Sequence, residues 1–258
     1  MFSATYFTYD GEYSGNYGLM IADFNNNPVI ETATFSPVLN TYKPSITHRF
    51  FNNGIMFEAP PQHQFSIISE TPIPDFLRRK ILSWLVARDS FKKLIIHQPD
   101  LQDYYYKCIF TDTSLIFVNG QCHGFRLTAN FDSVYQYGIP NELVVTGDGS
   151  VKSEVIINDS DIIDDYVYPT VKFSSLSGGI DIINKTDAQR TFSFSGLQPN
   201  EEIMVDNELK YIKSSLEKER LSSFNKNWLR LKKGINRLEI KINGQVTITC
   251  PTYAMMGF

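Results

Sequence analysis

The chain has 258 residues, of which 42% are hydrophobic and 20% are charged, and its formal net charge is −4. That composition is typical of a globular protein with its own core and excludes an intrinsically disordered chain. The negative net charge argues against a protein whose main task is to grip the phosphate backbone of nucleic acids.

Aromatic residues make up 14% of the chain, with 19 phenylalanines and 14 tyrosines but only 2 tryptophans. Strands favour such residues, so we predict a mainly β protein, and the length allows two domains. No apolar run reaches the length of a membrane span, and residues 1–5 lack the pattern of a signal peptide. We therefore expect the protein to stay in the compartment where it is made. Three cysteines outside any C-x-x-C pair are expected to be reduced and buried: Cys108, Cys122 and Cys250.

Strand-like residues begin close to the start of the chain, with Phe2 and the stretch 6–9, and Asp10-Gly11 follows them. Asp-Gly and Asn-Gly pairs mark tight turns because glycine adopts a positive φ without steric cost. A second pair of this kind, Asn53-Gly54, also lies between strand-like runs. We expect a hairpin turn at both pairs and an ordered N-terminal end.

Residues 74–86 predict the one convincing helix. Leu77, Ile81, Trp84 and Leu85 share one stripe at a spacing of 3.6 residues, and polar residues lie away from it. The proline at the start suits the first helical position. We expect this helix to cover a sheet with its apolar stripe.

Four further strands are expected after the helix and before the middle of the chain. They cover residues 92–96, 104–110, 115–118 and 125–131, and Asn119-Gly120 provides a turn before the last of them.

The composition changes near Gly138, where we place a boundary between two β-rich domains. Residues 209–221 suit either a helix or a strand, a turn and a second strand. Between residues 238 and 250, apolar and polar residues alternate around Asn243-Gly244. We predict a half-buried hairpin there, with its turn at this pair.

Residues that could carry chemistry do not assemble into a known catalytic or metal-binding motif. The acidic run 158–165 lacks the glycine and the closing glutamate of an EF-hand loop, and the four histidines are scattered. Ser193 and Ser195 follow strand alternation and do not form a nucleophile elbow. Asp100 and Asp103 are the candidate carboxylates for glycoside hydrolysis, although a loop entering a strand explains them equally well. We predict no catalytic, cofactor-binding or metal-binding residue.

Lysines and arginines between residues 210 and 241 make the second half locally basic. Together with Phe224 and Trp228 they would suit single-stranded nucleic acid, but glutamates in the same region dilute the charge. Trp228 would also suit stacking on a sugar, although a tryptophan that enters a strand is more often a core residue. We expect a solvated face and a core tryptophan.

Several short stretches follow one another in a characteristic order along the chain. Phe7-Thr-Tyr-Asp-Gly11 is followed by Tyr17-Gly-Leu19, by the helix ending Ile81-Leu-Ser-Trp-Leu85, by Tyr104-Tyr-Tyr106 and by Asn227-Trp-Leu-Arg-Leu-Lys-Lys-Gly-Ile-Asn236. In this order and spacing, the sequence resembles the distal tail protein family of long-tailed bacteriophages that infect Gram-positive bacteria. The resemblance spans nearly the whole chain.

The resemblance implies a virion protein of the tail tip built from two β-sandwich domains. Residues 1–137, with the helix, would form a hexameric ring that continues the tail tube. Residues 138–258 would form a galectin-like attachment platform, with the last residues returning to the first domain. The histidine, asparagine and arginine set of sugar-binding galectins is absent, so sugar binding is not carried over.

The same resemblance implies partners but neither cofactor nor catalytic residues. The ring would join the major tail tube protein to a tail-associated lysin or tail fibre protein, with receptor-binding proteins as further partners. DNA would pass through the channel without specific binding, and the subunits would fold and assemble in the host cytoplasm.

A subunit of a ring must present complementary patches on two of its faces. Tyrosines suit such patches because they bury a large area at a small entropic cost. Three consecutive tyrosines in a strand also place at least one ring on each face. We predict that the contact surface includes Tyr6, Tyr9, Tyr13, Tyr17, Tyr104, Tyr105 and Tyr106.

Two other classes of protein remain as alternatives. A carbohydrate-binding module of a baseplate or cell-wall-associated protein would need exposed aromatic residues on one face of the second domain. A wall hydrolase would need a cleft with a carboxylate of shifted pKa.

Overall fold

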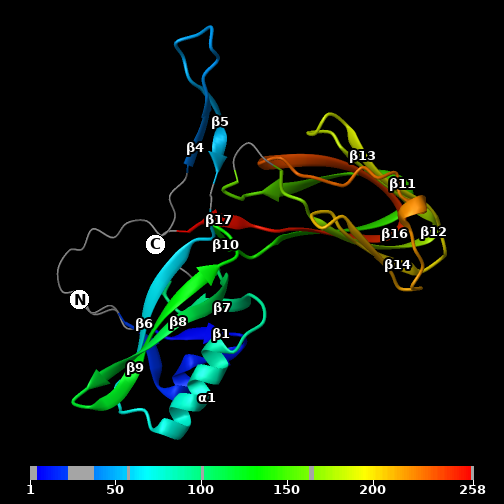
Figure 1. Ribbon diagram of the computed structural model, residues 1–258. Coiled ribbons are helices and arrows are strands. Elements are labelled where there is room, and N and C mark those ends of the chain that lie inside the picture. Colours follow the sequence, from blue (N-terminus) through cyan, green and yellow to red (C-terminus); the bar gives the residue numbers. More distant parts are fainter. Residues whose placement is uncertain (1–4, 23–37, 57–58, 100–101, 163–165, 257–258) are drawn as a thin grey trace. The chain divides into compact units, whose positions relative to one another are not determined.

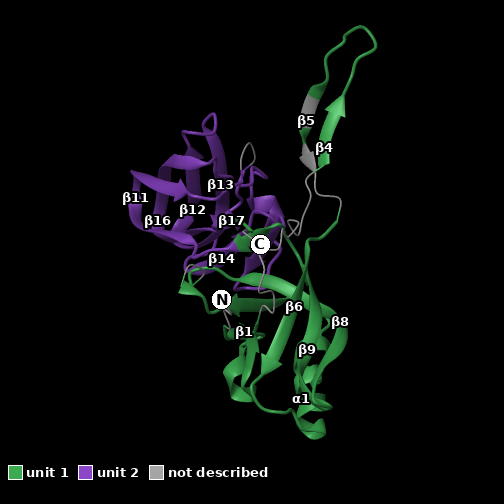
Figure 2. Ribbon diagram, turned by 90° about the vertical axis from the view of Figure 1, so that its left-hand side faces the viewer, with its two compact units in different colours: residues 1–136, 255–258 green, residues 137–254 purple. Residues whose placement is uncertain are grey.

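The computed structural model divides the described chain into two compact units, which Figure 2 colours separately. Unit 1 comprises residues 1–136 and 255–258, and unit 2 comprises residues 137–254. Phe2 and Asp100 lie outside the described residues. The structure describes, apart from the side chains of 52–53 and 55–56, residues 5–22, 38–56, 59–99, 102–162 and 166–256.

Unit 1 contains a seven-stranded antiparallel sheet with the strand order β2-β1-β7-β8-β9-β6-β3 (Figure 1). Alternate residues of its strands face one hydrophobic core, as the period of two in a pleated strand requires. A 3-10 helix, η1 (Ser14–Tyr17), follows the second strand. The strands are β1 (Phe7–Tyr9), β2 (Glu12–Tyr13), β3 (Leu19–Ile21), β6 (Gln62–Ser69), β7 (Lys92–Ile96), β8 (Tyr106–Val118) and β9 (Gln121–Phe131).

The predicted helix is confirmed as α1 (Asp75–Val86), which packs on the core face of this sheet. Ile81, Trp84 and Leu85 of its apolar stripe are buried. The Trp84 ring stacks on Phe7 with 5.8 Å between ring centroids, and its Nε1–H donates a hydrogen bond to the backbone oxygen of Tyr9 at 3.0 Å. The helix and the first strand therefore hold one another in place.

Two of the predicted turns are confirmed. Asp10-Gly11 joins β1 to β2, and Asn119-Gly120 joins β8 to β9. All four residues have a positive φ, between 50° and 79°, which is the backbone of a type I′ hairpin turn. The strands predicted at 104–110 and 115–118 are one strand, β8, interrupted by an irregularity between Thr111 and Ser114.

The predicted turn at Asn53-Gly54 is wrong, because both residues lie inside the strand β5 (Phe51–Met56). β5 pairs with β4 (Val38–Tyr42) in a separate two-stranded sheet, and the register shifts between Leu39 and Thr41. A positive φ of 105° at Gly54 serves this bulge instead of a turn.

The predicted hairpin at Asn243-Gly244 is also wrong, because one strand, β16 (Gly234–Cys250), runs straight through the pair. Its two ends both bury alternate residues in the core of unit 2. A Cβ at Gly244 would lie 2.1 Å from the backbone oxygen of Ser174, so glycine is needed here for close approach of two backbones.

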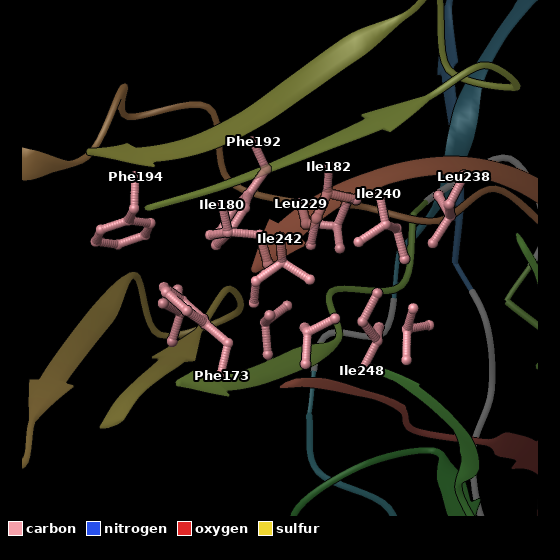
Figure 3. Close-up of a cluster of buried hydrophobic side chains, with 14 of the residues drawn as sticks. Phe173, Ile180, Ile182, Phe192, Phe194, Leu229, Leu238, Ile240, Ile242 and Ile248 are labelled. Carbon is pink, nitrogen blue, oxygen red and sulfur yellow. The ribbon is translucent and has the colours of Figure 1, made fainter. Parts of the chain in front are cut away.

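Unit 2 is built from a six-stranded sheet in which β11, β16, β12, β14 and β15 follow one another, with β13 paired to β12. β12 pairs with β14 before an irregularity at residues 175–180 and with β13 after it. Side chains from both halves of the sheet meet in one core (Figure 3). Residues 209–221 form a short strand and turns. The elements are β11 (Asn141–Asn158), β12 (Thr170–Asn184), β13 (Arg190–Leu197), β14 (Glu201–Asp206), β15 (Tyr211–Ser214), β16 (Gly234–Cys250) and η3 (Leu221–Ser223).

The chain passes twice between the residues of the two units. The short strands β10 (Tyr135–Tyr137) and β17 (Tyr253–Met255) form a separate two-stranded sheet at these passages. After β17, Met256 is buried in the core of unit 1, and its N–H donates to the backbone oxygen of Val134 at 3.1 Å. The chain is therefore mainly β, with one α-helix among the described residues.

Candidate self-association surface

Two of the seven predicted contact tyrosines are core residues of unit 1. Tyr9 and Tyr106 are 0% and 1% exposed, and their hydroxyls donate to the backbone oxygen of Cys108 at 3.2 Å and to Gln136 Oε1 at 2.7 Å. Burial raises the pKa of both, for Tyr106 to about 12. Because their side chains are on the face that α1 covers, they cannot supply outer contact area, and this part of the prediction is corrected.

Tyr6 and Tyr13 form an exposed aromatic group at one edge of the sheet, where β2 is the last strand. They are 39% and 41% exposed, their ring centroids lie 5.4 Å apart, and the His97 ring lies 5.7 Å from Tyr13. Thr8 Oγ1 shares a hydrogen bond of 2.8 Å with His97 Nε2. A Cβ at Gly15 would lie 2.3 Å from the Tyr13 ring, so that ring has room only because residue 15 is glycine.

Tyr17 is half-buried and is held by neighbours of its own unit. Its hydroxyl donates to Glu12 Oε1 at 2.5 Å, and this hydrogen bond, together with partial burial, raises the pKa of Tyr17 to about 12. Its ring lies 5.3 Å from that of Trp84 and under the Lys80 ammonium. Tyr17 therefore packs against residues of its own unit and adds little exposed area to the sheet edge.

Tyr104 and Tyr105 are half-buried at the entrance to β8. The Lys93 ammonium lies 4.2 Å from the centre of the Tyr105 ring, and burial raises the pKa of Tyr105. Of the three consecutive tyrosines, these two remain candidates for an outer contact, while Tyr106 belongs to the core.

The largest group of exposed apolar side chains in unit 1 lies in the β4–β5 hairpin, which sequence analysis did not predict to be a contact surface. The pairing of β4 and β5 involves no third strand among the described residues. Both strands and the connecting loop expose large apolar side chains, between 40% and 93% of each. These are Val38, Leu39, Tyr42, Ile46, Phe50 and Phe51.

The hairpin is also basic in a chain whose net charge is negative. Residues 32–57 contain no aspartate or glutamate, and they carry Lys43, His48 and Arg49, all exposed. The Lys43 ammonium lies 5.6 Å from the centre of the Phe50 ring, a cation–π distance. The signal for this surface is present in the sequence as an apolar, basic stretch without strict alternation, but interpreting Asn53-Gly54 as a turn concealed it.

The groups that could carry covalent or metal chemistry are not brought together in the part of the chain that the structure describes. All three cysteines are buried. Burial raises the pKa of Cys108, and it raises the pKa of Cys250 to about 12, so both thiols are disfavoured as thiolates. No group of three or more His, Cys, Asp or Glu side chains among the described residues is placed to hold a metal. Asp103 is exposed on a loop.

Trp228, the candidate for stacking on a sugar or a base, has a structural role in unit 2. Trp228 packs against the core of unit 2, with its ring 4.8 Å from that of Phe224, as the core interpretation predicted.

Within the described ranges, no helix is long and apolar enough to span a membrane.

Family models match both parts of the chain. Residues 2–133 match a phage tail protein N-terminal domain, and residues 135–250 match a phage tail C-terminal domain. The chain belongs to this family of phage tail proteins. No curated protein matches the sequence.

Two solved structures share the fold of this phage tail protein. One is the SPP1 Dit (gp 19.1) protein, described as a paradigm of the hub adsorption apparatus in phages that infect Gram-positive bacteria. It matches with a TM-score of 0.68 and 14% identity over 97% of this chain and 99% of that chain. The other is from the phage p2 baseplate in its activated conformation, with a TM-score of 0.56 and 9% identity over 96% and 98% of the two chains. The expected mainly β, two-part fold is confirmed, and the galectin-like character of the second part stays a prediction.

Proposed function

We propose that this phage tail protein is a structural, non-catalytic subunit of the tail tip and that copies of it associate into a ring, which we take to be hexameric. The observation that carries the proposal is the β4–β5 hairpin, with its exposed apolar and basic side chains. The shared fold with a hub protein and a baseplate protein supports the place of this ring at the tail tip.

The hairpin needs a partner for physical reasons. A two-stranded sheet alone is only marginally stable in water, and six large apolar side chains exposed together are unusual on a monomer. Covering them with another protein surface removes apolar area from water and stabilises the hairpin in the same step. Because the remainder of the chain is acidic, a second copy offers charge opposite to that of Lys43 and Arg49.

Ring closure requires contacts that run head to tail, in which two different patches of the subunit meet. The hairpin is one such patch. The sheet edge with Tyr6, Tyr13 and His97 is a second, because β2 leaves one side of the sheet unpaired and aromatic side chains exposed beside it. The tyrosines proposed for this second patch are thus Tyr6 and Tyr13, whose rings are exposed.

At the tail tip the ring joins the major tail tube protein to a tail-associated lysin or tail fibre protein, with receptor-binding proteins as further partners. DNA passes through its channel without specific binding, which agrees with a subunit of negative net charge. Assembly takes place in the host cytoplasm before the virion is complete.

The test measures ring formation by the full chain, alone and co-expressed with the neighbouring tail proteins of the same phage. We expect closed rings in negative-stain images and a matching mass by sedimentation. Phe50→Ser with Phe51→Ser should leave the protein monomeric, because this removes two exposed hairpin aromatics.

Phe76→Ser with Phe91→Ser is the matched control, since these two phenylalanines of unit 1 are 76% and 44% exposed but lie outside the hairpin. Rings should form normally with that variant. Equal ring yield from the hairpin variant and the wild type would reject the hairpin as the contact, and absence of rings in all samples would reject the ring itself.

A further inference from the structure

A hollow of about 460 Å³ lies on the solvent-facing side of the sheet of unit 2, across the strands β16, β12, β14 and β15. This volume falls within the range of small-ligand sites in proteins. The face opposite to it is the hydrophobic core, so the hollow belongs to unit 2 alone. The side chains that line its open side include Lys172, Ser174, Glu202, Met204, Lys213 and Gln245.

The strand register arranges these side chains in two parallel rows. In the first row Lys172 is paired with Met204, and Met204 is paired with Lys213. In the second row Ser174 is paired with both Glu202 and Gln245 on its two neighbouring strands. Residues paired in this way project on the same face of a sheet, so each row presents its side chains together to the solvent.

The two lysines of the first row are available for an anion. Lys172 and Lys213 lie two strands apart, about 10 Å between backbones, with the half-buried Met204 between them. Neither is in any ion pair found among the described residues, although Glu202 stands in the adjacent row. Two flexible ammonium groups on either side of one apolar side chain can converge on a single acidic group above it.

The second row supplies what hydroxyl groups of a ligand need. The Glu202 carboxylate accepts hydrogen bonds only, Gln245 both donates and accepts, and the Ser174 hydroxyl does either. Hydroxyl-binding groups beside two lysines that are in no ion pair among the described residues, in a hollow of small-ligand size, therefore favour a small acidic ligand that carries hydroxyl groups, the chemistry of an acidic saccharide.

We propose that this hollow, which we name the β12–β14 groove, binds an acidic saccharide. Its acidic group lies between Lys172 and Lys213, and its ring hydroxyls reach Glu202, Ser174 and Gln245. The acidic group is a carboxylate or a phosphate, since both carry the charge that two lysines recognise. The site works in one subunit and is independent of the ring contacts proposed above.

The test is an NMR titration of the full, isotope-labelled chain with three probes: trigalacturonate, a maltotriose phosphate and neutral maltotriose. We expect the two acidic probes to shift the amide signals of β12, β14 and β15, and the neutral probe to bind at least about fivefold more weakly. Carboxylate and phosphate sources are distinguished by which of the two acidic probes binds more tightly.

Lys172→Gln with Lys213→Gln should weaken binding of the better acidic probe by about tenfold, because both charge-assisted contacts are lost. Lys218→Gln with Lys241→Gln is the matched control, since it removes the same charge from exposed lysines of unit 2 outside the groove, and it should bind within about twofold of wild type. The proposal is overturned if no probe shifts these signals at 10 mM, a concentration set on the order of weak saccharide affinities. Equal binding of the neutral probe, or an equal loss in the control, also overturns it.

Discussion

Unit 1 contains two groups of aromatic side chains that face opposite environments. Around α1, Phe7, Tyr9 and Trp84 are at most 5% exposed and contact one another. In the β4–β5 hairpin, Phe50 and Phe51 are 68% and 50% exposed. The first group is completed by the folding of its own chain, and the second is left incomplete.

The difference separates residues that stabilise the subunit from residues that we propose to join subunits. Replacing a buried side chain removes contacts and leaves a cavity, which lowers the free energy of unfolding. Replacing an exposed side chain changes the isolated subunit little but removes area from a contact. Burial within the unit therefore predicts which of two measurements, unfolding or assembly, a substitution changes.

The largest expected effect is on the core side of α1. Leu85→Ala should lower the free energy of unfolding of unit 1 by about 3 kcal/mol, because Leu85 lies on the core face of α1 and is fully buried. The measurement is urea unfolding followed by Trp84 fluorescence in a Trp228→Phe background, which leaves one indole in the chain.

Phe76→Ala on the same helix is the matched comparison, since Phe76 is 76% exposed. Its free energy of unfolding should stay within about 0.5 kcal/mol of the parent. Similar losses from the two substitutions would break the division between buried and exposed residues in this region.

The same division applies to charge pairs in unit 2. Glu201 is buried and accepts two hydrogen bonds from Arg220, at 2.8 and 2.5 Å, and one from Ser214 at 2.5 Å. Glu201→Gln should lower the free energy of unfolding by roughly 2 kcal/mol, because Arg220 loses its counter-charge. Trp228 fluorescence in a Trp84→Phe background reports this. The partly exposed Lys185–Glu239 pair is the control, and Glu239→Gln should lower the free energy of unfolding by less than about 0.5 kcal/mol.

The Glu201 site also predicts how the stability of unit 2 depends on pH. Burial alone would raise the pKa of Glu201, but the hydrogen bonds from Arg220 and Ser214 outweigh it and lower the pKa from 4.5 to about 2. A carboxyl whose pKa is lowered by folding stabilises the folded state above its unfolded pKa and loses that effect in acid. The urea concentration at the midpoint of unfolding should therefore decrease as the pH is lowered from 4.5 to 2. In Glu201→Gln this decrease should be smaller. An equal slope in both proteins would assign the acid sensitivity elsewhere.

How far the sequence predicted the fold is clearest at its Asx-Gly pairs. Asp10-Gly11 and Asn119-Gly120 are hairpin turns, but Asn243-Gly244 lies within β16. A two-residue turn makes residues 242 and 245 face the same side, so residues 247 and 249 would also be buried with Ile242. In the chain the apolar residues are instead at 246, 248 and 250, the phase of one continuous strand. The alternation of apolar residues predicts one continuous strand, and the hairpin prediction was wrong because it followed the Asn-Gly turn signal instead.

The candidate site was predictable only in part. Periodicity identified the stripe of α1 because burial of one helix face follows from the sequence itself. It could not separate Tyr6 and Tyr13 from Tyr9, since which face of a short strand is covered depends on a helix that lies some 70 residues further along the chain. The β12–β14 groove depends on the register of four strands, and single-sequence patterns do not specify such pairing.

A smaller effect is expected where the first strand places a hydroxyl in the core. Tyr9→Phe should lower the free energy of unfolding by about 1 kcal/mol, because the backbone oxygen of Cys108 loses its buried hydrogen bond. Tyr13→Phe removes the hydroxyl of an exposed tyrosine from β2, the partner strand of β1. This change should leave the free energy of unfolding within about 0.3 kcal/mol of the parent. Trp84 fluorescence in the Trp228→Phe background distinguishes the two, and an equal cost for both would contradict the placement of Tyr9 in the core.

The smallest effect on stability, and the sharpest test of the comparison, is expected at the edge of the sheet. Tyr6→Ser with Tyr13→Ser should keep the free energy of unfolding within about 0.5 kcal/mol of wild type, because both rings are exposed. The same variant should reduce the yield of rings in the assembly experiment, since the proposed second patch loses its aromatic area. A normal ring yield would remove this edge from the contact while leaving the hairpin in place. A large loss of stability would show that the two rings stabilise the fold of unit 1. In that case the exposure of a side chain in the isolated subunit would not predict whether it contributes to folding or to assembly.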